Sequence, residues 1–278
     1  MPHVSIPLKK GPGKPGTMKE ETIMKKLIAL VLSLLLVLCG VAALAETETE
    51  SKGVLVMATN ASFPPYEYYE GTEIVGIDVE IAAAVAERMG YDFVVVDMEF
   101  DAIISAVNSG KANFGMAGMT VTEERLLSVD FSISYATGVQ VVIVREDSPI
   151  TSVDDLFAEG ANYTIGVQLS TTGDLYTTWD LEDNGLATIN RYPNGNEAVM
   201  ALKAGKVDCV VIDNEPAKAY VAANEGLKIL PTEYVVENYA ACFAKGDPLL
   251  VEFNATLQEM IDDGTVGVIV EKYIPTEE

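Results

Sequence analysis

The order of strand and helix patterns along this chain constrains its fold more than any other feature. The first half alternates apolar strand patterns with helix patterns, at residues 54–59, 77–89, 93–96, 100–107, 114–119 and 122–129. The second half repeats the alternation, at residues 139–144, 163–168, 188–191 and 207–212 for strands and from residues 171, 196 and 216 for helices. Two further helix patterns follow at residues 249–262 and 266–273. Such alternation is typical of mainly parallel sheets covered by helices, so we predict an α/β fold.

A short internal repeat suggests that the fold has two similar lobes. Residues 106–114 read AVNSGKANF, and residues 201–209, offset by 95 positions, read ALKAGKVDC. Each copy predicts the end of a helix, a Gly-Lys turn and the start of a strand. Unrelated helix-to-strand connections also have this appearance, so the repeat supports the two lobes only together with the alternation.

The N-terminal region resembles an export signal rather than part of the fold. Lys25 and Lys26 precede a nearly uninterrupted apolar run at residues 27–38, and Ala43-Leu44-Ala45 follows. This is the order of a secretory signal peptide at residues 24–45, which makes residues 1–23 an upstream mis-start. The apolar run is shorter than the roughly 20 residues that span a membrane. An uncleaved anchor helix and a lipid anchor on Cys39 remain alternatives.

Composition excludes several classes of function for the exported chain. Residues 1–45 hold six of the 18 basic residues and two of the 42 acidic ones, so the remainder has 12 and 40 and a net charge of −28. This charge opposes binding to nucleic acid or to anionic lipid. The single histidine, His3, is removed with the signal, and Cys209 and Cys242 lie in apolar runs that favour buried free thiols. We therefore predict no metal, no cofactor and no histidine-dependent catalysis.

Ligands of open parallel sheets bind at the carboxyl ends of strands. In this sequence those ends fall at residues 60–66, 118–125 and 168–172 and at Asp213. They combine a cation, an acid, hydroxyl groups and aromatic rings. Such a set suits a small zwitterion.

Arg125 and Asp213 are the charged candidates at these ends. Arg125 lies in the first turns of a short helix, where its guanidinium and the free helical N–H groups could hold a carboxylate. It could equally form a solvated ion pair with Glu123 or Glu124. Asp213 could bind an ammonium group, or it could cap the helix near Pro216.

Hydroxyl and aromatic residues complete the candidate set. Residues 170–173, Ser-Thr-Thr-Gly, open a helix and could grip a carboxylate, or they could form an ordinary helix cap. Phe63 and Tyr66 flank two prolines beside Asn60, and Phe100 opens another helix. These rings could stack on a ligand or simply cover the core.

Two motifs resemble a known family. Gly76-Ile77-Asp78-Val79-Glu80-Ile81, continued through Met89, resembles the signature of the extracellular solute-binding proteins of polar-amino-acid ABC importers, bacterial family 3. The run GMTVTEER at residues 118–125 makes the resemblance more specific, and the likeness covers residues 53–275. It implies a type II periplasmic-binding-protein fold and capture of an amino acid without catalysis.

The resemblance also implies roles for nine residues. It assigns Arg125 and Thr172 to the ligand carboxylate, Gly118 and Thr120 to further donors, Asp213 to the ammonium group, Tyr66 and Phe100 to stacking, and Asn60 and Gln168 to side-chain selection. Ser170 departs from the family, which usually has glycine there. Asn60 stands where binders of cationic amino acids often have an acid, so we expect a polar, uncharged amino acid.

The family architecture implies lobe boundaries. Lobe 1 would comprise residues 53–138 and 246–278, and lobe 2 residues 139–245, joined by crossing strands at residues 139–144 and 239–245. Closure of the lobes would enclose the ligand, and a membrane permease would recognise the closed form. We expect a monomer at the periplasm or the outer face of the cell membrane.

Two other classes of function use the same fold. A hydro-lyase acting on prephenate-like acids would need a general acid in the cleft; Glu67 or Glu197 could serve, but nothing in the sequence marks either one. A stand-alone sensory domain is the third class, and a chain that ends at Glu278 without a signalling domain counts against it.

Overall fold

The computed structural model describes residues 51–275. The predicted signal peptide at residues 24–45, the segment 1–23 and Cys39 lie outside the described residues. No helix within residues 51–275 has the length and apolarity needed to cross a membrane.

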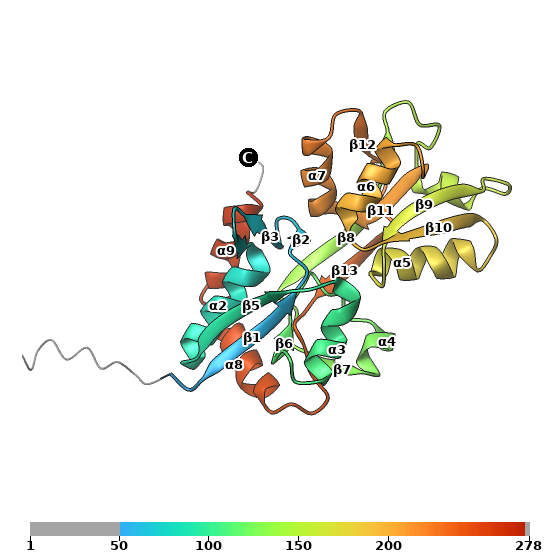
Figure 1. Ribbon diagram of the computed structural model, residues 1–278. Helices are drawn as coiled ribbons and strands as arrows, with labels where there is room; N and C mark the ends of the chain where they lie inside the picture. The colour runs from blue at the N-terminus through green and yellow to red at the C-terminus, as the bar shows by residue number, and fades with distance from the viewer. Residues whose placement is uncertain (1–50, 276–278) are drawn as a thin grey trace, which may run out of the picture. The chain divides into compact units, whose positions relative to one another are not determined.

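The first sheet has the strand order β5-β1-β6-β14-β7. Strands β5, β1, β6 and β7 of this sheet are labelled in Figure 1. These strands are β1 (Val54–Thr59), β5 (Asp92–Asp97), β6 (Phe114–Gly115), β7 (Val129–Phe131) and β14 (Cys242–Ala244). Side chains of β1 alternate between two cores: Leu55 and Met57 face α2 (Ile77–Met89), α8 (Leu249–Asp262) and α9 (Thr265–Tyr273), while Ala58 faces α3 (Ile103–Asn108). Helices therefore cover both faces of this sheet.

The second sheet has the order β10-β9-β11-β8-β12, with β13 also paired to β8. Its strands are β8 (Ala136–Arg145), β9 (Tyr163–Gln168), β10 (Ala187–Tyr192), β11 (Cys209–Asp213), β12 (Leu227–Ile229) and β13 (Val235–Tyr239). Val141 and Ile143 pack with α6 (Gly195–Lys203) and α7 (Asn214–Ala223), whereas Val142 and Val144 face a separate core on the other side. β8 is thus a central strand buried on both faces, which explains its uninterrupted valine and isoleucine run.

Both sheets are mixed rather than mainly parallel. β1 pairs in parallel with β5 and β6, and β9 with β10 and β11, as predicted. β14 is antiparallel to β6 and β7, and β8 is antiparallel to β11, β12 and β13. The prediction of mainly parallel sheets did not include these antiparallel pairs. The chain leaves the first sheet after β7 and returns to it in β14, and it enters the second sheet in β8 and leaves it after β13, so the two strands of each pair run in opposite directions.

The passages between the sheets differ from the predicted crossing strands. Residues 139–144 lie wholly inside β8, in the second sheet, because their alternating apolar side chains fill both of its cores. The chain passes between the sheets at residues 132–135 and again at residues 240–241, between β13 and β14. Only the second passage falls within its predicted range, 239–245.

The internal repeat has the same geometry in both sheets. Lys111 N–H donates to the Ala106 carbonyl at 2.9 Å, and Lys206 N–H donates to the Ala201 carbonyl at 2.9 Å. Gly110 and Gly205 both adopt positive φ, at 73° and 68°. The matching turns show that the repeat marks equivalent helix-to-strand connections.

A small three-stranded sheet was not predicted. It consists of β2 (Ser62–Phe63), β3 (Glu67–Glu70) and β4 (Glu73–Val75) in that order. Its strands are too short for a hydrophobic period to be read. It leads into α2 and places Phe63 and Glu67 beside the first sheet.

Candidate functional site

A cavity lies where the strand ends of both sheets meet. Eight of the nine predicted site residues line it: Asn60, Phe100, Gly118, Thr120, Arg125, Gln168, Thr172 and Asp213. Asn60 follows β1, Gln168 ends β9, and Asp213 ends β11. Their convergence follows from the placement of parallel strand ends at one edge of each sheet.

Arg125 is buried in α4 (Glu123–Leu126), and its guanidinium contacts both halves of the site. It donates to the Thr120 carbonyl at 2.7 Å and to the Ser170 carbonyl at 2.9 Å. Its guanidinium lies 5.3 Å from the centre of the Phe100 ring. The predicted alternative, an ion pair with Glu123 or Glu124, is absent from the described residues. Burial lowers the pKa of Arg125, and attraction to Glu237 opposes that shift.

Thr172 lies one residue after the N-cap Thr171 of α5 (Thr172–Thr177), as the helix-start pattern predicted. Its hydroxyl donates to Glu237 Oε2 at 2.9 Å, and Gln140 Nε2 donates to the same oxygen at 3.0 Å. Glu237 Oε1 has no hydrogen-bond partner within the described part of the chain. Sequence reasoning missed Glu237 and Gln140, because the antiparallel pairing of β13 with β8 brings them together.

Asp213 both caps a helix and lines the cavity. Its Oδ1 accepts from Glu215 N–H at 3.2 Å, which caps α7. Its Oδ2 accepts from Val139 N–H at 3.0 Å and from the hydroxyl of Tyr239. Burial raises the pKa of the Asp213 carboxyl to about 7. The two alternatives for this residue, cap and cavity group, are therefore compatible.

Asn60 and Gln168 meet across the cavity. Gln168 Nε2 donates to Asn60 Oδ1 at 2.9 Å and to the Pro193 carbonyl at 3.2 Å. Asn60 Nδ2 donates to the Met98 carbonyl at 2.9 Å. The two amides thus join the ends of β1 and β9.

The structure places the two aromatic residues predicted to stack on a ligand differently. Phe100 lines the cavity, but Tyr66 does not. Tyr66 packs in the core instead, edge-on to Tyr239 with ring centres 5.3 Å apart. Phe63, its neighbour in the same loop, lines the cavity in its place. The β2–β3 turn decides which ring faces inward, and no sequence pattern specifies that turn.

Glu67 is a cavity-lining acid that was not assigned as a ligand-binding residue. It is 1% exposed, and neither of its carboxylate oxygens has a hydrogen-bond partner among residues 51–275. Burial raises the pKa of Glu67 well above its ordinary value, and the nearby Asp78 carboxylate adds to the shift. The sequence signal was its position two residues after Pro65, in the loop that follows β1.

Asp78, from α2, fixes the backbone of the cavity wall. Its Oδ2 accepts from Gly118 N–H at 2.8 Å and from the Tyr135 hydroxyl at 2.7 Å. Gly118 has a φ of 52°, and a Cβ there would lie 2.8 Å from the Phe63 ring. Glycine is therefore required where this wall approaches the aromatic ring.

The described residues contain no group of three or more side chains that could hold a metal ion. Both thiols, Cys209 and Cys242, are free and buried. The cavity thus presents hydrogen-bonding groups, one buried guanidinium, carboxyl groups and the aromatic rings of Phe63, Phe100 and Tyr239.

Comparison with known proteins identifies the family. Residues 55–276 match the bacterial extracellular solute-binding proteins, family 3. The chain belongs to this family. Its members are binding proteins for amino-acid uptake, and the family assignment agrees with the resemblance in the two sequence motifs.

A curated relative and two solved structures support the assignment. The arginine-binding extracellular protein ArtP of Bacillus subtilis strain 168 is 33% identical over 255 residues, covering 90% of this chain and 97% of that protein. An ancestral arginine-binding protein bound to arginine superposes with a TM-score of 0.74 at 38% identity, covering 80% of this chain and 98% of its own. The ancestral protein bound to glutamine superposes with a TM-score of 0.73 at 37% identity over the same shares. The fold of this solute-binding protein is that of the type II periplasmic binding proteins.

Proposed function

We propose that this solute-binding protein captures an amino acid outside the cytoplasm, without chemical turnover, and delivers it to the permease of an ABC importer. The observation that supports this most is that Arg125 and Asp213 line the same cavity. The guanidinium provides donors for a carboxylate, and the acid provides an acceptor for an ammonium group. An α-amino acid carries both groups on one carbon.

The donors around Arg125 define a carboxylate subsite. Thr120 lines the cavity beside the guanidinium and Thr172 lines it from the second sheet, whereas the single N–H of Gly118, also in the wall, already donates to Asp78. The guanidinium has five N–H donors, and two of its nitrogens already hold carbonyls. The remaining N–H groups can take a carboxylate without breaking those bonds.

Two lobes would enclose the amino acid. We assign the first large sheet to lobe 1 and the second to lobe 2, so the lobe boundaries lie at the passages at residues 132–135 and 240–241 rather than after residues 138 and 245. A ligand that contacts both lobes binds the closed form better than the open form, so binding shifts the population toward closure. The permease would recognise the closed monomer.

We propose that the preferred ligand is cationic, of the arginine type. The expectation of an uncharged ligand rested on finding no acid among the assigned positions, but Glu67 lines the cavity with both carboxylate oxygens unpartnered. Phe63 and Phe100 line it too, and a guanidinium stacks well on aromatic rings. Curated relatives named as arginine-binding proteins support the same choice.

Export and anchoring complete the proposal. The signal peptide at residues 24–45 would direct the protein to the periplasm or to the outer face of the membrane. Cleavage after Ala45 would release it, and lipidation of Cys39 would tether it. In both cases the binding site faces the same compartment.

Competition binding by calorimetry tests the proposed function. The wild-type protein should bind L-arginine more tightly than L-glutamine, and Arg125→Ala should weaken both by about 2–5 kcal/mol because a charge-assisted contact is lost. Retention of wild-type affinity in Arg125→Ala would refute the carboxylate subsite.

Glu67→Gln tests the side-chain assignment separately. The substitution keeps shape but removes the charge that would pair with a guanidinium. We expect arginine affinity to fall at least about tenfold and glutamine affinity to change less than about twofold. Equal losses for both ligands would show that Glu67 has only a structural role.

A further inference from the structure

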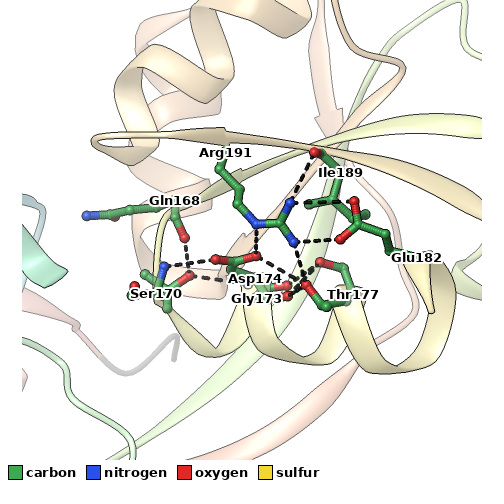
Figure 2. A network of polar contacts seen from close by, with 10 residues as sticks. Gln168, Ser170, Gly173, Asp174, Thr177, Glu182, Ile189 and Arg191 are labelled. Carbon is green, nitrogen blue, oxygen red and sulfur yellow. Dashed lines mark hydrogen bonds and ion pairs between the residues drawn. The ribbon is translucent and has the colours of Figure 1, made fainter.

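A polar network beside the cavity connects Ser170, Asp174 and Arg191 (Figure 2). Ser170 has a φ of 63°, in the left-handed region that residues other than glycine, asparagine and aspartate seldom adopt. Its N–H donates to Asp174 Oδ2 at 2.9 Å. Its carbonyl accepts from Arg125 at 2.9 Å. The bond to Asp174 therefore supports the conformation in which the Ser170 carbonyl faces the other half of the site.

Asp174 is fixed at both carboxylate oxygens. Arg191 Nε, from β10, donates to Oδ1 at 2.8 Å, and the Thr178 hydroxyl donates to the same oxygen at 3.3 Å. The far side of Arg191 pairs with Glu182 at 2.7 Å. Asp174 is 5% exposed, so its carboxylate is shielded from water, whereas the side chains of Arg191 and Glu182 are 32% and 34% exposed.

Neither Asp174 nor Arg191 lines the proposed ligand cavity. Any effect of these two residues on the ligand is therefore indirect. Asp174 holds the backbone of Ser170, and the Ser170 carbonyl in turn holds the guanidinium of Arg125. The Arg125–Ser170 hydrogen bond joins α4 to the loop before α5, so it can exist only when the two halves of the site are together.

We propose that Asp174, held by Arg191, is a positioning residue that presents the Ser170 carbonyl to Arg125 as a closing latch. The inference builds on the proposed function, because it concerns the lifetime of the closed, amino-acid-bound form. Breaking the latch should speed ligand release more than it slows ligand capture, because the bond forms after encounter.

Stopped-flow kinetics with L-arginine tests the latch in Asp174→Asn, with Glu182→Gln as matched control. Both variants remove one carboxylate from the Arg191 network, but only Asp174 touches Ser170. We expect the dissociation rate of Asp174→Asn to rise about tenfold with association unchanged within about threefold. Glu182→Gln should keep wild-type rates. Equal dissociation rates in the two variants would overturn the inference.

A ligand-free measurement separates this inference from the proposed function. Lys111 and Lys206 are exposed on the equivalent turns of the two halves, so cysteines placed there can carry a dye pair. The native thiols are buried. In the absence of ligand, Asp174→Asn should lower the closed fraction and Glu182→Gln should leave it unchanged. An unaltered closed fraction overturns the latch whatever the ligand, whereas failure of wild type to bind any amino acid overturns only the proposed function.

Ser170→Gly and Ser170→Pro provide a second pair of variants. Glycine adopts positive φ readily and keeps the carbonyl, so its dissociation rate should stay within about threefold of wild type. Proline fixes φ near −65° and lacks the N–H that Asp174 holds. Its dissociation rate should match or exceed that of Asp174→Asn, and a wild-type rate in the proline variant would contradict the latch.

Discussion

Asp213 combines two functions in one carboxylate, because its two oxygens face different partners. Oδ1 caps α7, while Oδ2 accepts from Val139 N–H and from the Tyr239 hydroxyl at the cavity. Burial without a cationic partner raises the pKa of the carboxyl to about 7. An ammonium ligand favours the ionised form, so ligand binding and proton loss are linked.

Asp213→Asn tests this linkage. In the wild-type protein, binding below pH 7 requires Asp213 to release its proton, so affinity should fall by up to about tenfold per pH unit as the pH drops from 7 to 5. The asparagine variant should bind more weakly at pH 8 and lose most of that pH dependence, while the helix cap persists because asparagine caps as well as aspartate. Calorimetry with L-glutamine, which does not recruit Glu67, measures both effects. A variant with the wild-type pH slope would exclude Asp213 as the ammonium acceptor.

At the scale of elements, the start of α2 is set by the loop that precedes it. Tyr66 and Pro65 carbonyls accept from Asp78 N–H at 3.0 Å and from Ile77 N–H at 3.1 Å. Gly76 permits this contact, since a Cβ there would lie 2.2 Å from the Tyr66 carbonyl oxygen at a φ of 132°. The glycine of the signature motif therefore has a steric explanation, and the same helix carries Asp78 to the cavity wall.

Gly76→Ala should destabilise the fold by about 3–5 kcal/mol, through backbone strain and overpacking together. Gly71→Ala is the matched control, because its φ is also positive, at 66°, but no atom lies within 4 Å of the added Cβ. The control should cost only about 1–2 kcal/mol. Urea unfolding compares the two variants, and similar losses would show that the close approach to Tyr66 does not matter.

On the scale of the whole molecule, buried acids link stability to pH. Burial raises the pKa of Asp78 to about 6 and that of Asp213 to about 7, and it raises the pKa of Glu67 as well. The folded protein therefore binds more protons than the unfolded chain between about pH 4 and pH 7. Protonation of these acids therefore stabilises the folded protein. This stabilisation is fully present below the pKa values of the unfolded chain, and it is lost as the pH rises through the higher pKa values of the folded protein.

We expect the ligand-free protein to unfold at a higher temperature at pH 5 than at pH 8. Calorimetry in 1 M salt isolates the buried groups, since the screening length there is about 3 Å and surface repulsion is suppressed. Asp263, whose pKa is lowered to about 2 by Thr265 and Arg88, titrates below this window. A melting temperature that is constant or rises with pH would show that the buried acids are paired in solution.

The sequence alone determined many of the elements and much of the cavity lining. Hydrophobic periodicity placed β1, α2 and α8 at the observed bounds, because each buries a regular face along its own length. The segments at the strand ends contain Arg125, Asp213 and five other predicted lining residues, since ligand-binding side chains of such sheets follow the strands in the chain.

Only the tertiary structure decided which groups complete the cavity. Glu237 and Gln140 meet because β13 pairs with β8, and Phe63 rather than Tyr66 faces inward because of the β2–β3 turn. The partner of the Ser170 carbonyl is Arg125, which lies 45 residues away. These outcomes depend on strand register and loop conformation. A chain's local pattern does not encode them, because they result from packing between segments that are distant in sequence.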